Sequence, residues 1–186
     1  MRFDQFIEQS GIAVSPVDSI DGFIVDVGLP SEWVPLDSVH GVRVWIWRCD
    51  PHITEFCANA VLTMHCIDAP LEAGEMFAML SEQQAHMLSG SRIEQNELGA
   101  AKEGPGFTGT FAMIFASPFG PIGSVSRSRI ITADRRTLVA QLTITAMQDS
   151  PVDRTNIWLS VTPGASGDSV SRYCNEGSFR ASSDGH

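Results

Sequence analysis

Hydrophobic and polar residues alternate with a period of two along much of this chain, which is the pattern of β-strands with two unlike faces. The run 136–147 is the clearest case, because from residue 138 on, one of its faces carries only apolar residues: Leu138, Ala140, Leu142, Ile144 and Ala146. The run 58–66 alternates in the same way. We expect Ala58, Ala60, Leu62, Met64 and Cys66 to face the core, and Asn59, Val61, Thr63 and His65 to lie on a mixed opposite face.

Further strand-like runs are separated by residues that favour turns. They cover 11–17, 22–30, 42–49, 92–99, 106–116 and 123–132. The Pro- and Gly-rich stretch 117–123 and the sequence ADRR at 133–136 connect the last strands, which predicts an antiparallel meander.

Three segments have the spacing of amphipathic helices. The first is 2–10, with Phe3, Phe6 and Ile7 on one side and Gly11 as its C-cap. The second is 69–90, whose apolar stripe consists of Ala73, Met76, Phe77, Leu80 and Met87. The third is 149–161, with Ser150 as N-cap, Pro151 at the first helical position, and the stripe Ile157, Trp158 and Val161.

These elements predict an α+β fold, in which helices sandwich one antiparallel sheet in an α/β/α layered domain. We expect one such domain over residues 1–162. From residue 163 to 186 the chain is rich in Ser, Gly and Asp and has few apolar residues, which predicts a flexible tail.

Charge narrows the set of partners. The chain of 186 residues has 22 acidic and 12 basic side chains, for a formal net charge of −10. Nucleic-acid affinity and attraction to anionic lipid both depend on clustered Lys and Arg, so neither partner is expected.

Location is predicted from the N-terminal sequence and the cysteines. The start, MRFDQFIEQSG, has no apolar run of the length that a secretory signal needs, and no stretch is long enough to span a membrane. We expect a cytoplasmic protein whose cysteines, Cys49, Cys57, Cys66 and Cys174, stay reduced.

The order of elements and two sequences resemble a known family. FIVDVGLPSEWVPL is a strand that ends in Pro and is followed by Trp, and GPGFTGTF lies in the meander. Over residues 12–162 the chain resembles the LpqN-type lipoproteins of actinobacteria, a family with a PsbP-like fold. The resemblance implies a non-enzymatic domain that binds a partner or a lipid-like ligand, often in connection with the cell envelope. This chain departs from the family because no signal peptide or lipidated cysteine precedes Cys49, so we expect a cytosolic relative.

The stretch CDPHITEFC is the densest group of chemically reactive side chains. A zinc site would use Cys49, His52 and Cys57, with His65 or Cys66 as the fourth ligand. Structural zinc favours pairs such as C-x2-C, whereas these two cysteines are eight positions apart and bracket a loop. We therefore interpret the stretch as a hairpin loop without a metal.

A thiol enzyme is the second interpretation of this loop. His52 would activate Cys57, and Asp50 or Glu55 would orient the imidazole. Free cysteines are unreactive unless their thiolate is stabilised, so we do not expect catalysis, and nothing calls for a cofactor.

Binding residues are expected on two strand faces and one helix. Trp45 and Trp47 share a face, and aromatic side chains are enriched at interface hot spots when they are exposed. Arg127 and Arg129 also share a face, which could receive a carboxylate. The methionines of the second helix, Met76, Met79 and Met87, could line an adaptable apolar pocket, but residues at this helical spacing more often belong to the core.

The leading hypothesis is a binding module that holds a protein partner or an apolar, lipid-like molecule between its sheet and a helix. Two alternatives stay open. One is a small hydrolase or thiol enzyme that uses Cys57 and His52, and the other is a scaffold that acts through its C-terminal tail.

Overall fold

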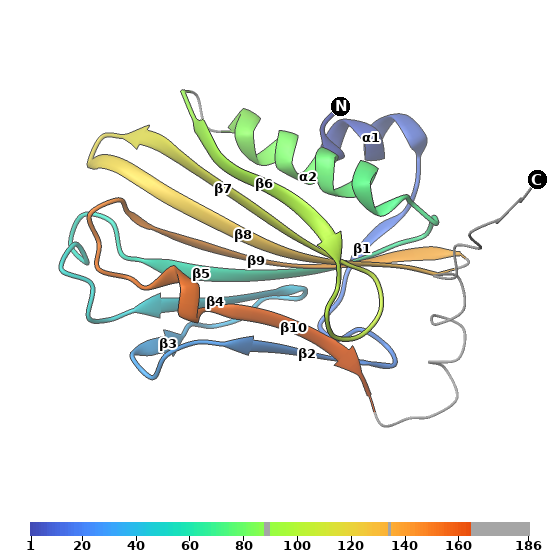
Figure 1. Ribbon diagram of the computed structural model, residues 1–186, viewed down its shortest axis with the longest axis horizontal. Helices are drawn as coiled ribbons and strands as arrows, with labels where there is room; N and C mark the ends of the chain where they lie inside the picture. The colour runs from blue at the N-terminus through green and yellow to red at the C-terminus, as the bar shows by residue number, and fades with distance from the viewer. Residues whose placement is uncertain (88–89, 134, 165–186) are drawn as a thin grey trace, which may run out of the picture.

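An antiparallel sheet of eight strands organises the residues that the computed structural model describes, which are 1–87, 90–133 and 135–164. Figure 1 shows this sheet with helices on one side and a two-stranded ribbon on the other. The elements in chain order are α1 (Phe3–Ser10), β1 (Val14–Pro16), β2 (Phe23–Gly28), β3 (Trp33–Pro35), β4 (Val42–Trp47), β5 (Asn59–Ile67), α2 (Ala73–Met87), β6 (Arg92–Ala100), β7 (Phe107–Ser117), β8 (Gly120–Ala133), β9 (Arg136–Met147), η1 (Arg154–Asn156) and β10 (Trp158–Pro163).

The spatial order of the large sheet is β3-β4-β5-β9-β8-β7-β6, and β1 pairs with β5 beside this path. Strands β6 to β9 form the expected meander, in which each strand pairs antiparallel with the next. Strand β9 then pairs with β5, which places the two most regularly alternating runs of the sequence side by side at the centre. The prediction of an α+β fold with an antiparallel sheet is confirmed.

One face of the large sheet packs against the ribbon formed by β2 and β10. The predicted inward residues of β5 and β9 are buried here, including Leu62, Leu142 and Ile144. Ile157 and Val161 cover them from the other side. This apolar layer is the larger core of the protein, and it holds the ribbon to the sheet.

The other face carries α1 and α2. Helix α1 ends at Gly11, whose φ of 66° is the left-handed conformation that a C-cap glycine adopts, as expected. Helix α2 contacts β6, β7 and β8, and α1 packs beside it. A second core forms under α2 around Met76, Phe77 and Met79. Among the described helices none is long and apolar enough to cross a membrane.

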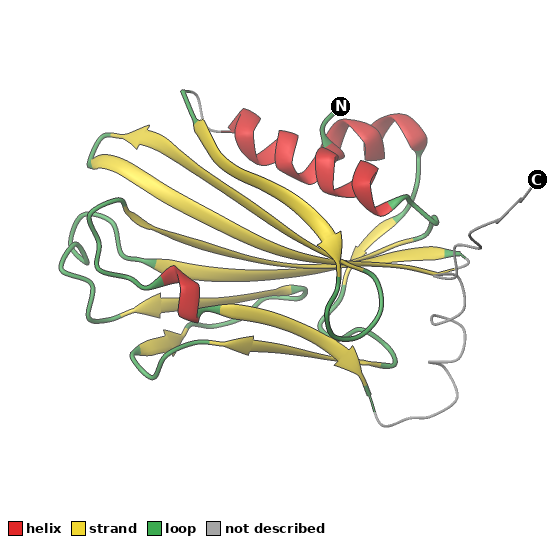
Figure 2. Ribbon diagram, in the orientation of Figure 1, coloured by secondary structure: helices red, strands yellow, loops and turns green. Residues whose placement is uncertain are grey.

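The predicted helix at 149–161 is wrong. This segment forms a short 3₁₀ turn, η1, followed by strand β10, which pairs antiparallel with β2 (Figure 2). Ile157 and Val161 are buried as expected. Their spacing of four residues does not distinguish the two structures, because it places both side chains on one side of a helix and also on one face of a strand. Trp158, expected in the same buried stripe, is half exposed because it lies on the outer face of the strand. The layer opposite α2 is therefore a ribbon and not a helix.

Met87, expected in the buried stripe of α2, has 73% of its surface exposed at the end of that helix. The predicted flexible tail at 163–186 lies, from residue 165 on, outside the described residues, so the tail and the single-domain boundary at 162 stay predictions.

Packing of α2 on the sheet depends on a glycine. A Cβ atom at Gly109 of β7 would lie 2.4 Å from the ring of Phe77, whereas one at Gly99 of the neighbouring strand β6 would have no atom within 4 Å. We expect Gly109→Ala to lower the free energy of unfolding by about 1–3 kcal/mol, the usual cost of overpacking. Urea denaturation measures this loss. Gly99→Ala is the matched control, and an equal loss in both variants would contradict the packing described here.

A pocket between helix α2 and the sheet

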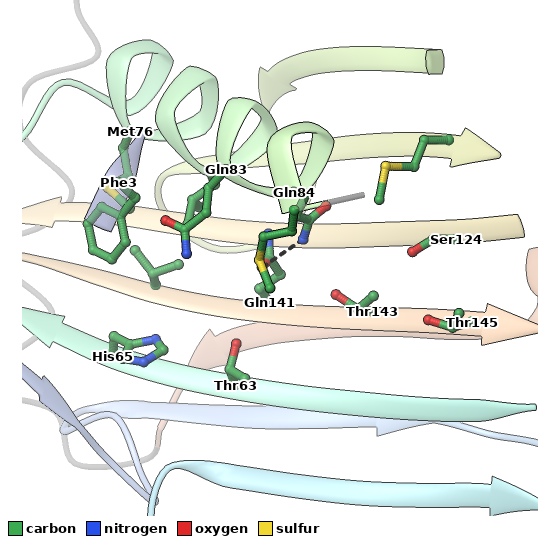
Figure 3. Close-up of a pocket in the computed structure, with 14 residues that line it drawn as sticks. Phe3, Thr63, His65, Met76, Gln83, Gln84, Ser124, Gln141, Thr143 and Thr145 are labelled. Atoms are coloured by element: carbon green, nitrogen blue, oxygen red, sulfur yellow. Dashed lines mark hydrogen bonds between the residues drawn. The ribbon is translucent and has the colours of Figure 1, made fainter. Parts of the chain in front are cut away.

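A pocket of about 480 Å³ opens between α2 and the central strands of the large sheet. Figure 3 shows the helix above and the strands below, with side chains of both pointing into the space between them. Pockets that bind small molecules in proteins have volumes of about 300–1,000 Å³. This one therefore has the size of a ligand site.

The floor of the pocket comes from the mixed faces of three adjacent strands. Because β5, β9 and β8 are neighbours, their alternating residues on the α2 side form one surface. It consists of Thr63 and His65 from β5, Val139, Gln141, Thr143 and Thr145 from β9, and Ser124 from β8. The floor is thus rich in hydroxyl and amide groups, although it lies within a sheet.

The roof of the pocket is mostly apolar. Phe3 of α1 and Met76, Leu80 and Met87 of α2 line it, and Met113 of β7 closes one side. Thioether side chains adapt their shape to irregular ligands. The pocket therefore combines a flexible apolar roof with a polar floor.

Two glutamines join the roof to the floor. The Gln84 amide on α2 donates a hydrogen bond to the Gln141 side chain, and Gln141 donates in turn to the Ser128 hydroxyl. The Ser126 hydroxyl donates to Gln84 and also bonds to Thr143. Figure 3 shows the Gln84–Gln141 bond between the end of the pocket with Phe3 and His65 and the end with Ser124 and Thr145.

Other polar groups of the floor have no partner among the described residues. These groups are the hydroxyls of Thr63, Ser124 and Thr145 and the imidazole of His65. Polar groups turned away from bulk water need a hydrogen-bond partner, which in a pocket is water or a ligand. The floor therefore has unused capacity to bind a polar group of a guest molecule.

The pocket is electrostatically neutral. None of its fourteen described lining residues is Asp, Glu, Lys or Arg. Burial lowers the pKa of His65, which favours its uncharged form. A guest molecule in this pocket would meet hydrogen-bonding groups but no counter-ion.

The sequence indicated part of this pocket. Met76 and Met87 line it, as the methionine pattern of the second helix suggested, whereas Met79 is buried in the core under α2. The hydroxyl-rich floor was not predicted as a site. The sequence did contain a sign of it: the runs 58–66 and 136–147 have mostly polar residues at every second position, and both runs form central strands that do not face bulk water.

The stretch CDPHITEFC is the loop between the antiparallel strands β4 and β5, as expected. Asp50 organises it: this carboxylate has 3% of its surface exposed and accepts hydrogen bonds from the backbone N–H groups of His52 and Ala58 and from the Ser150 hydroxyl. The described residues contain no group of three or more His, Cys, Asp and Glu side chains placed to hold a metal ion.

No hydrogen bond joins the side chains of Cys57 and His52 among the described residues. The Cys57 thiol donates to the backbone carbonyls of Trp47 and Ala58, and His52 lies 3.6 Å from a Glu55 oxygen and 3.2 Å from an Asp149 oxygen. Burial raises the pKa of the Cys57 thiol, and the charge of Asp50 raises it further. The loop therefore disfavours a reactive thiolate.

Trp45 and Trp47 lie on the face of β4 that packs against the larger core. Both are half-buried there, and Trp47 is opposite Trp33 of β3. Both tryptophans therefore pack in the way that is expected when this face of the strand is covered. A role in binding a partner stays a prediction.

Arg129 reaches β10, and Arg127 reaches the turn η1 that precedes it. Arg129 has 7% of its surface exposed and donates to the carbonyls of Glu103 and Val161 and to the Thr108 hydroxyl. Arg127 donates to the carbonyl of Arg154. Arg129 is therefore not on an accessible basic face, because it is buried and joins β8 to the ribbon. A binding role for either arginine stays a prediction.

Comparisons with known proteins identify the fold. No family model and no curated protein sequence matches the chain. The crystal structure of LpqN from Mycobacterium tuberculosis, described as involved in cell envelope biogenesis, superposes with a TM-score of 0.67. The match covers 88% of this chain and 98% of LpqN. This chain has the fold of LpqN. The sequences are 14% identical, so the likeness confirms the resemblance in fold and carries no site residue across.

The lowered pKa of His65 predicts how stability depends on pH. Below its ordinary pKa of about 6.5 the unfolded chain binds a proton at this residue more readily than the folded protein, so acid destabilises the fold. We expect His65→Gln to lose less unfolding free energy between about pH 7.5 and pH 5.5 than the parent protein. His86→Gln, at an exposed position of α2, is the control. If both variants follow the parent curve, His65 is not buried as described.

The raised pKa of Cys57 predicts slow thiol chemistry. In variants that retain one cysteine each, we expect maleimide to label Cys57 more slowly than the exposed Cys49 at about pH 8, because the pKa of Cys57 is raised and its side chain is less exposed. Faster labelling of Cys57, which then becomes slow in His52→Ala, would instead support the thiol-enzyme interpretation.

Proposed function

We propose that this protein is a non-enzymatic binding module that holds a small, uncharged and largely apolar molecule between α2 and the sheet. The observation that supports this most is the pocket of about 480 Å³, in which an apolar roof faces unpartnered hydroxyl groups. Both kinds of group converge on one concave space, as they do in small-molecule sites.

A small molecule is favoured over a protein partner as the occupant. Protein interfaces are usually broad surfaces with aromatic residues at their centre. Trp45 and Trp47, the aromatic pair expected to serve in that way, pack against the larger core. The concave pocket is the better-supported site.

We extend the proposal to the chemistry of the cell envelope. LpqN, which shares this fold, is described as involved in cell envelope biogenesis. A lipid-like envelope molecule has the apolar body that Phe3, Met76 and Leu80 would cover. A cytoplasmic location stays a prediction beside this proposal.

Filling the pocket tests the proposal. The probe is N-phenyl-1-naphthylamine, an uncharged dye that fluoresces in apolar surroundings. We expect Leu80→Trp to weaken its binding by about tenfold or more, because the indole ring occupies volume that the dye needs. Ala78→Trp, which adds the same ring at an exposed position of the same helix, should bind like the parent.

A second variant blocks the pocket from the floor. Thr63→Phe changes a half-buried residue of β5 and leaves α2 untouched. Circular dichroism confirms that each variant is folded before its affinity is compared. Equal dye affinity in the parent, Leu80→Trp and Thr63→Phe would show that the pocket is not the binding site.

A further inference from the structure

Two hydroxyl groups stand opposite each other at one end of the pocket. Ser124 of β8 and Thr145 of β9 are direct partners in the antiparallel register, which places their Cβ atoms about 4.5–5.5 Å apart. Neither hydroxyl bonds to a described residue, although Ser124 has only 6% of its surface exposed. The neighbouring pair, Ser126 and Thr143, shows the contrast, because these hydroxyls bond to each other at 2.9 Å.

An uncharged oxygen of a ligand suits this pair. A hydroxyl group both donates and accepts, so one ligand hydroxyl can donate to Ser124 and accept from Thr145, or the reverse. A carbonyl oxygen can accept from both. Each arrangement gives the two unpartnered side chains the hydrogen bonds that the protein itself does not provide.

An ionised group does not suit it. Burying a charge away from water is costly unless an opposite charge compensates it, and the described lining residues include no Asp, Glu, Lys or Arg. The whole chain has a formal charge of −10, which further opposes an anion. Hydrogen bonds from Ser124 and Thr145 would replace only part of a carboxylate's hydration.

We propose that Ser124 and Thr145 form a specificity subsite that takes one uncharged hydroxyl or carbonyl group of the ligand and rejects the ionised carboxylate of an otherwise identical molecule. This inference rests on the proposed function, since it concerns the same pocket. The apolar body of the ligand extends past the Gln84–Gln141 bond toward Phe3 and Met76, which lie at the other end (Figure 3).

A matched set of ligands tests the selection against charge. Displacement of N-phenyl-1-naphthylamine is measured with 1-decanol, decanoate and decylammonium, each below its aggregation concentration and at about pH 8, where decanoate is ionised. We expect 1-decanol to bind about tenfold or more tightly than either ion, because neither ion finds a counter-charge. Equal or tighter binding of decanoate would overturn the inference.

Removal of each hydroxyl tests the subsite. We expect Ser124→Ala and Thr145→Val to weaken 1-decanol binding by about 2- to 13-fold each, which is the value of one hydrogen bond. Thr110→Val, at a half-buried position on the opposite face of β7, is the matched control. Unchanged affinity for 1-decanol in both subsite variants would show that the alcohol binds elsewhere.

A gained charge provides the converse test. We expect Thr145→Lys, checked for folding by thermal melting, to bind decanoate more tightly than the parent does and 1-decanol less tightly, because the ammonium group supplies the missing counter-ion. A lysine that leaves the preference for the alcohol unchanged contradicts the placement of the subsite. If neither the dye nor any of the ligands binds the parent protein, the proposed function fails, whereas dye binding without selection against decanoate refutes only the subsite.

Discussion

The width of a helix relative to the width of the sheet determines how this fold is built. Seven strands follow one another along the main sheet, so at about 4.8 Å between neighbours the sheet is about 29 Å wide. A single α-helix has a diameter of about 10–12 Å and covers about two to three strands. Helix α2 contacts β6, β7 and β8, and the central strands β9 and β5 extend beyond its flank. The pocket is the space that this mismatch leaves beside the helix.

The two faces of the sheet are covered in different ways. Opposite the helices, the β2–β10 ribbon lies over the centre of the sheet and buries a continuous apolar layer, and the Arg129 guanidinium secures it through the carbonyl of Val161. On the helical face the strands beside α2 carry Thr, Ser and Gln residues, which a dry core would leave without partners. Some of these side chains form hydrogen bonds with one another, as Gln84 does with Gln141 and Ser126 with Thr143. Others have no described partner and face the open pocket.

Local periodicity predicted the strands well and the layers incompletely. The runs 58–66 and 136–147 alternate so regularly that their inward faces follow from the sequence, and the structure buries those faces as expected. The segment 149–161 begins with residues that favour a helix N-terminus, and its apolar residues Ile157 and Val161 fit both periods, so the sequence predicts a helix. Pairing with β2 makes residues 158–163 a strand instead. The pocket was harder to predict, since it depends on where α2 lies across the sheet, and Ser124 and Thr145 become neighbours only through the pairing of β8 with β9.

The central claim is that a ligand enters the space between α2 and the sheet, and the methionine side chains can report this directly. Of the seven methionines, Met76, Met87 and Met113 line the pocket, whereas Met64 lies in the core on the opposite face of the sheet. The measurement is a methyl NMR titration of protein labelled with ¹³C at the methionine methyl groups, with 1-decanol as the ligand. The account predicts saturable shifts of the three pocket methyl signals while the Met64 signal stays in place. A saturable shift of Met64 with no change at the pocket methionines would contradict it.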